Sequence, residues 1–109
     1  MVANMEYCLD LSITEITDGE PATLYVYLYY KLDGVIYALP ENIQLQYENV
    51  SWLHLSDTPV IENNKIKYTF IVDDFIETNF ENYDPYFARE CLFSYTINGI
   101  NISKNFKQY

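Results

Sequence analysis

Residues 22–39 have the sequence ATLYVYLYYKLDGVIYAL, which contains the clearest structural signal in the chain. The period of two in its first half is typical of a half-buried β-strand. Asp33-Gly34 favours a two-residue type I′ turn, because both residues tolerate positive φ. The apolar face of the strand carries Leu24, Val26, Leu28 and Tyr30. A turn at Asp33-Gly34 sets Leu32 opposite Val35, Tyr30 opposite Tyr37 and Leu28 opposite Leu39, so turn chemistry and alternation predict one and the same hairpin.

Two further asparagine-containing pairs predict hairpins of the same kind. Asn98-Gly99 is the strongest two-residue turn signal, and it places apolar residues opposite one another on both flanking strands. Asn63-Asn64 sets Glu62 opposite Lys65, which predicts a cross-strand ion pair. In the last hairpin the predicted cross-strand pairs are Ile97 with Ile100, Tyr95 with Ile102, Cys91 with Phe106 and Phe93 with Lys104.

The remaining segments complete a β-rich fold with one helix. Alternation over residues 5–14 and 43–48 predicts two more strands. From Asp73 the apolar spacing becomes helical, and Asp74 with Glu77 three residues later suggests a capping box. We therefore expect a helix of two to three turns that ends before Asp84. The sequence therefore predicts a single mainly-β domain over residues 1–109: an antiparallel β-sandwich or small, partly open barrel of seven to eight strands with one short helix.

The charge balance excludes several partner classes. With 16 acidic and 6 basic residues the net charge is −10, so we expect no direct nucleic-acid binding and no attraction to anionic membranes. No apolar run is long enough to span a bilayer, and the first ten residues do not resemble a signal peptide. Two widely spaced cysteines suggest reduced thiols, and we expect a cytoplasmic protein.

Residues capable of catalysis or metal binding are scarce, so we expect no enzyme activity, no cofactor and no metal. His54 is the single histidine, which excludes a two-histidine metal site within one chain, and we expect it to be partly buried and hydrogen-bonded. Cys91 falls on an apolar face, where thiols are usually inert. Cys8 has Glu6 and Asp10 nearby, and acidic neighbours raise a thiol pKa.

Tyrosine is unusually abundant, with 12 residues in 109. Tyr25, Tyr27 and Tyr29 lie on the face of their strand opposite the apolar stripe, which makes them candidate partner-binding residues. Tyrosine provides a large contact area at low entropic cost, together with a hydroxyl group. The alternative is that the helix covers this face as a third layer.

The expected helix carries a second candidate surface. Asp74, Glu77, Glu81 and Asp84 recur every three or four residues, which places them on one helical stripe. Such a stripe could pair with Lys or Arg of a partner, or it could be a solvated helix face.

These features favour a protein-binding function. Immunity proteins paired with toxic nucleases, and phage-encoded inhibitors of nucleic-acid-binding enzymes, resemble this chain in size, acidity and aromatic content, a likeness of composition alone. We therefore expect a small acidic antagonist of a basic or nucleic-acid-binding protein. The alternatives are a carbohydrate- or small-ligand-binding β-sandwich that uses the tyrosine row, and a self-associating structural subunit of a larger assembly.

Overall fold

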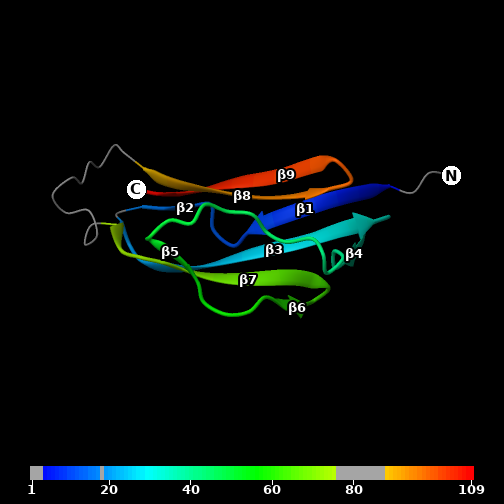
Figure 1. Cartoon of the computed structure of the whole chain (residues 1–109), viewed down its shortest axis with the longest axis horizontal. Coiled ribbons are helices and arrows are strands. Elements are labelled where there is room, and N and C mark those ends of the chain that lie inside the picture. The colour runs from blue at the N-terminus through cyan, green and yellow to red at the C-terminus, as the bar shows by residue number, and fades with distance from the viewer. Residues whose placement is uncertain (1–3, 18, 76–87) are drawn as a thin grey trace.

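The computed structural model describes residues 4–17, 19–75 and 88–109, and these residues form nine strands in two sheets (Figure 1). The larger sheet contains β1 (Met5–Leu11), β3 (Ala22–Leu32), β4 (Val35–Tyr37), β5 (Leu53–Leu55), β6 (Val60–Glu62) and β7 (Lys65–Val72). The smaller sheet contains β2 (Glu15–Ile16), β8 (Arg89–Ile97) and β9 (Ile100–Gln108). The predicted mainly-β sandwich is confirmed, with more strands than the seven to eight expected and without closure into a barrel.

The larger sheet is built around β3. Its neighbours are β1 on one side and β7 on the other, and all pairings in this sheet are antiparallel. Two short strands, β5 and β6, pair with the far edge of β7, while β4 extends the edge of β3 beyond β7. In the smaller sheet β9 lies between β8, which is antiparallel to it, and β2, which is parallel to it.

All three predicted hairpin turns are confirmed. Asp33, Asn63, Asn64 and Asn98 have positive φ values between 50° and 62°. Gly34 and Gly99 have φ values of 83° and 76°, in the left-handed region that glycine adopts without steric cost. Each hairpin therefore has positive φ at both central positions, as a type I′ turn requires. The predicted register of the last hairpin is confirmed over its whole length, including Phe93 opposite Lys104.

The first hairpin is shorter than predicted. β4 ends at Tyr37, and Leu28 pairs with Leu9 of β1 and Ile66 of β7 instead of with Leu39. The reason is that β7 already occupies the edge of β3 at residues 22–28, so the chain after Tyr37 has to leave the sheet.

The strand predicted over residues 43–48 is wrong. This segment forms a single bridge, in which Gln46 and Ser94 of β8 exchange backbone hydrogen bonds of 2.7 and 3.0 Å. The side chain of Leu45 is buried, and its N–H donates to the hydroxyl of Tyr68 at 3.2 Å instead of to a neighbouring strand. Alternation here reflects an extended loop packed onto the sandwich.

The first predicted strand, over residues 5–14, is shorter in the structure. β1 ends at Leu11, and the chain resumes as β2 beside β9. Ser12 lies at the corner, where its N–H donates to Tyr25 O and its hydroxyl accepts the Tyr25 N–H, both at 2.9 Å. A polar residue at this position satisfies the backbone where the chain changes sheet.

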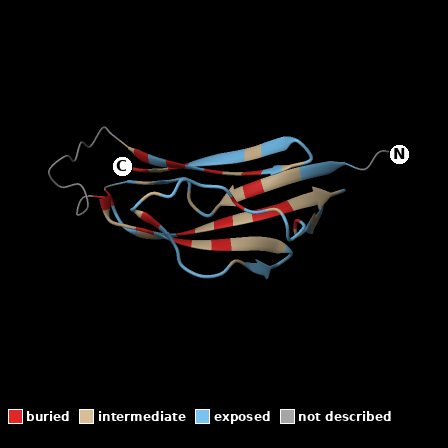
Figure 2. Ribbon diagram, viewed as in Figure 1, coloured by how far each residue is buried: buried red, intermediate tan, exposed pale blue. Residues whose placement is uncertain are grey.

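The core lies between the two sheets, where buried residues alternate with half-buried or exposed ones along the longer strands (Figure 2). Phe70 of β7 and Phe93 of β8 are fully buried, and their ring centroids lie 5.3 Å apart across the interface between the sheets. One cluster unites the buried side chains of both sheets: Leu9, Leu24, Val26, Leu28, Leu39, Leu45, Leu53, Tyr68, Phe70, Val72, Cys91, Phe93, Tyr95 and Phe106.

One charged side chain, Arg89, is also buried at the start of β8. Its guanidinium lies 4.6 Å from the ring centroid of Trp52 and 4.5 Å from that of Phe75. Its Nε donates to Gln108 Oε1 at 2.7 Å, and its Nη2 donates to Asp73 O at 2.6 Å. Burial lowers the pKa of Arg89, and nearby carboxylates oppose this shift. The interaction joins β8, β9 and the chain that follows β7.

Candidate functional site

The tyrosine row lies on the outer face of the larger sheet, as the alternation predicts. In the described part of the chain this face is covered by lysine side chains of β7 and not by a helix. Lys67 Nζ lies 4.3 Å from the ring centroid of Tyr25, and Lys65 Nζ lies 4.5 Å from that of Tyr29 and 5.6 Å from that of Tyr27. Tyr25 and Tyr27 are half-buried and Tyr29 is buried. Stacking of a flat ligand on these rings would require the lysines to move.

The lysines are themselves held in place by charge. The predicted ion pair between Glu62 and Lys65 is replaced by a diagonal one, in which Glu62 contacts Lys67 Nζ at 3.0 Å. This hydrogen bond raises the pKa of Lys67. Lys65 lies over the tyrosine rings instead, because cation–π contact competes with an exposed ion pair of little net value.

On the other side of the row, β1 contributes acidic and thiol groups. The Tyr29 hydroxyl donates to Asp10 Oδ2 at 2.5 Å, and Cys8 lies directly opposite Tyr29. Burial, followed by the hydrogen bond to Asp10, raises the pKa of Tyr29 above its usual range. Burial and then the charge of Glu6 raise the pKa of Cys8. Both groups are therefore protonated at neutral pH.

These raised pKa values predict a loss of stability at alkaline pH. Burial also raises the pKa of Cys91 from 9.0 to about 11 and that of Tyr95 above its usual range. A group with a raised folded-state pKa stabilises the fold below its unfolded pKa and loses this effect as pH rises through the folded value. We therefore expect the free energy of unfolding to fall with pH from about pH 9 upward. In Tyr29→Phe the decline above pH 10 should be shallower, by up to about 1 kcal/mol per pH unit after allowance for solvent screening. Urea titrations at successive pH values measure both slopes, and equal slopes would exclude the Tyr29 contribution.

The acidic stripe is described only at its first residue. Glu77, Glu81 and Asp84, and most of the predicted helix, lie outside the described residues. Asp74 is half-buried next to Asp73, whose carboxylate contacts His54 Nε2 at 2.8 Å. The prediction that His54 is partly buried is wrong, because its side chain lies on the outer face of β5 and is 52% exposed. Its hydrogen bond to Asp73 agrees with the expectation of a satisfied side chain.

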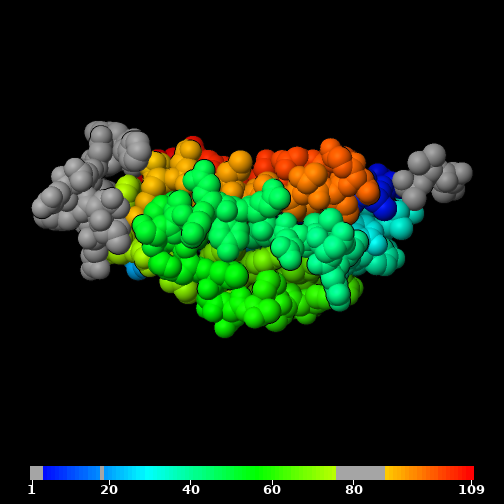
Figure 3. Space-filling model, viewed as in Figure 1, coloured from blue at the N-terminus to red at the C-terminus, as the bar shows by residue number. Residues whose placement is uncertain are grey.

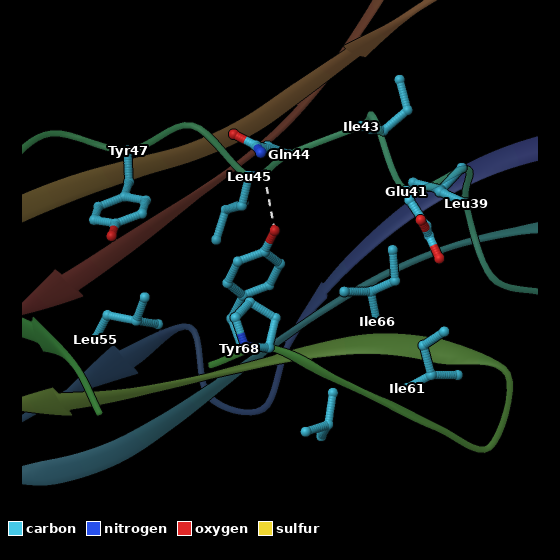
Figure 4. Close-up of a pocket in the computed structure, with 12 residues that line it drawn as sticks. Leu39, Glu41, Ile43, Gln44, Leu45, Tyr47, Leu55, Ile61, Ile66 and Tyr68 are labelled. Atoms are coloured by element: carbon cyan, nitrogen blue, oxygen red, sulfur yellow. Dashed lines mark hydrogen bonds between the residues drawn. The ribbon is translucent and has the colours of Figure 1, made fainter. Parts of the chain in front are cut away.

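A second surface, which the sequence did not predict, is an apolar groove on the side of the molecule shown in Figure 3, where residues 39–55 cross between β8–β9 and β6–β7. We call it the 39–68 groove, and its volume is about 470 Å³. Figure 4 shows one wall from the loop after β4 and another from β5, β6 and β7. The lining residues are Leu39, Glu41, Ile43, Gln44, Leu45, Tyr47, Leu55, Pro59, Val60, Ile61, Ile66 and Tyr68.

The 39–68 groove is preformed and partly open to solvent. The hydrogen bond from Leu45 N–H to the Tyr68 hydroxyl ties its two walls together (Figure 4). Tyr68 is 8% exposed, whereas Val60 and Ile61 on the rim are 56% and 66% exposed. An apolar concavity with exposed aliphatic side chains at its edge is typical of a surface that binds a partner.

The charge around the groove is one-sided. Glu41 lies in its wall, and all six basic residues lie elsewhere in the described chain. The placement of the bases follows from strand alternation and burial: Lys31, Lys65 and Lys67 are on strands β3 and β7, Lys104 and Lys107 are on β9, and Arg89 is buried. The groove therefore combines an apolar floor with one carboxylate and no basic side chain in its lining.

One sequence signal could have indicated this groove. Val60 and Ile61 are adjacent in a three-residue strand that follows Pro59, so both faces of this edge strand are apolar. In a half-buried strand one of the two faces is normally polar. The other wall could not be recognised, because residues 39–47 resemble a strand in pattern.

Neither the comparisons with known proteins nor a search for metal sites and membrane-spanning helices assigns a function. Searches against protein-family models, curated proteins and solved structures find no match. Within residues 4–17, 19–75 and 88–109, no cluster of His, Cys, Asp and Glu has the arrangement of a metal site. Among the same residues no helix has the length and apolar character needed to cross a membrane.

Proposed function

We propose that this protein is a small protein-binding module that acts as an antagonist of a basic partner protein, with the 39–68 groove as its contact surface. The observation that carries the proposal is an open apolar groove, lined by Glu41 and by no basic side chain, on a chain with a net charge of −10. Apolar contact supplies affinity after desolvation, and complementary charge steers the encounter.

The charge of the chain supports a basic protein as the partner and not nucleic acid. A phosphate backbone would be repelled, whereas the basic surface of a nucleic-acid-binding protein would be attracted. A protein that covers such a surface competes with the nucleic acid for it, which is the action of an antagonist.

The reactive groups of the described chain support binding in preference to catalysis. Burial raises the pKa of Cys91 to about 11 and also raises that of Cys8, so both thiols are poor nucleophiles at neutral pH. The lysines over the tyrosine row also weaken the case for the carbohydrate-binding alternative, which needs bare aromatic faces.

Capture from the cytosolic lysate of the native host at increasing salt tests this function. We expect recovery of a basic protein to fall about tenfold or more between ~50 and ~300 mM salt, because screening weakens charge-steered contacts. Ile61→Ser removes an exposed groove side chain, and we expect it to reduce recovery by a similar factor. Ile71→Ser is the matched control, since Ile71 is 40% exposed on the outer face of β7, and recovery should not change. Recovery insensitive to both salt and Ile61→Ser would contradict the proposal.

A further inference from the structure

We propose that the occupant of the 39–68 groove is a cationic amphipathic helix of the partner protein. This inference rests on the proposed function and adds the conformation and chemistry of the bound segment. It follows from the edge structure of the larger sheet, the length of the groove and the position of its charges.

The edge next to the groove is unsuited to an added strand. β5 and β6 are three residues each, and both pair with the same edge of β7. Residues 56–59 separate them, and Ser56 N–H already donates to Thr69 O at 2.8 Å. Pro59 lies in this interruption and has no N–H to donate. Because strand addition needs a continuous row of free backbone groups, the groove offers side-chain contacts instead.

The length of the groove suits two turns of helix. Leu55 at one end pairs with Phe70 of β7, and Ile61 at the other end pairs with Ile66. These positions on β7 are four residues apart, which corresponds to about 13 Å along a strand. Side chains at positions i and i+7 of a helix are about 10 Å apart along its axis, so apolar residues at i, i+4 and i+7 would span the floor. Figure 4 shows Leu55 and Ile61 toward opposite ends of the groove, with Tyr68 between them.

One acidic side chain, Glu41, lies in the groove wall, beside the position that the polar face of such a helix would take. Glu41 is exposed in the loop wall, and Asp57 is exposed in the short segment between Leu55 and Pro59, two residues that line the groove. Lys or Arg on the flanks of the helix would lie near these carboxylates. A second copy of this chain is disfavoured in the same position, because each copy carries a net charge of −10.

Designed peptides provide the test. Three monomeric Leu/Lys peptides of one length and composition carry leucines at helical spacing, in strict alternation, or in scrambled order. Affinity is measured by fluorescence anisotropy, and the binding site is located from amide shifts in ¹⁵N-labelled full-length protein. We expect the helical peptide to bind about tenfold or more tightly than either of the others and to shift Leu45, Ile61 and Ile66. Circular dichroism should show it becoming helical on binding.

Matched variants confine the effect to the groove. Ile61→Ser and Glu41→Gln should each weaken the helical peptide about threefold to tenfold, because they remove one apolar and one charged contact. Ile71→Ser on the outer face and Glu15→Gln on β2 should leave its affinity unchanged.

The other outcomes separate this inference from the proposed function. Tighter binding of the alternating peptide at the groove would overturn the helical occupant while leaving a basic partner in place. The absence of groove shifts with every peptide would also overturn it, and salt-dependent capture then decides the proposed function independently. Self-association in sedimentation equilibrium that Ile61→Ser abolishes would identify a second copy as the occupant and overturn the inference.

Discussion

Replacing Phe70 by Ala is expected to lower the free energy of unfolding by about 4 kcal/mol, a large part of the stability of a domain of this size. Phe70 is fully buried at the centre of the sandwich. Its ring centroid lies 5.3 Å from that of Phe93 in the opposite sheet and 4.9 Å from that of Tyr47 in the loop wall of the groove. The substitution leaves a cavity that both sheets line and neither can fill. Urea unfolding, followed by circular dichroism, measures the effect.

Two control variants test whether the loss of stability comes from the cavity or from a general sensitivity of β7 to substitution. Ile71→Ala changes the next residue, which is 40% exposed on the outer face, and should cost less than about 1 kcal/mol. Phe70→Leu keeps most of the apolar volume and should cost less than about 2 kcal/mol. If Phe70→Ala and Ile71→Ala were equally mild, the packing of the two sheets described above would be wrong.

Replacing Arg89 by Met is expected to lower the free energy of unfolding by about 3 kcal/mol. The substitution leaves buried Gln108 Oε1 without the donor that lies 2.7 Å away, a loss of about 1–3 kcal/mol. It also removes the desolvated cation between Trp52 and Phe75, which contributes about 2 kcal/mol or less. Asp73 O keeps one donor, Gln108 Nε2 at 2.9 Å, and this limits the total loss of stability. Thermal and urea unfolding measure the change.

Matched variants test whether the hydrogen-bonding geometry of Arg89 causes this loss of stability. Lys104→Met removes an exposed charge from the paired strand and should change stability by less than about 0.5 kcal/mol. Arg89→Lys keeps the positive charge but cannot donate to Gln108 and Asp73 O from a planar fork, so it should recover less than half of the loss. Full recovery by Lys would show that charge alone matters at this position.

The hairpins could be predicted from the sequence because the information for them is local. Asp33-Gly34, Asn63-Asn64 and Asn98-Gly99 adopt positive φ, and few other residue pairs do so without strain. Once the turn is fixed, the register of the flanking strands follows residue by residue. The alternation then assigns each side chain to the core or to the outer face, and for Tyr25, Tyr27 and Tyr29 that assignment agrees with the structure.

The burial of Arg89 could not be predicted, because a charged residue is normally expected at the surface. Its position depends on Gln108, Trp52 and the carbonyl of Asp73, which come from three separate parts of the chain. The parallel pairing of β2 with β9 could not be predicted either, because it also depends on residues that are distant in the sequence. It joins Glu15 to Lys107 across most of the sequence, and no local signal encodes it.

The two candidate surfaces also differ in how far the sequence predicts them. The alternation indicated the tyrosine row, but the sequence did not show that Lys65 and Lys67 lie across its rings. The 39–68 groove arises because β7 displaces the chain after Tyr37 from the sheet, and the resulting loop packs against Tyr68, which is distant in the sequence. Turn chemistry and side-chain period act over a few residues and therefore specify hairpins and faces. A groove between a loop and a sheet depends on which of several possible neighbours each strand edge takes, and competition between distant segments settles that choice.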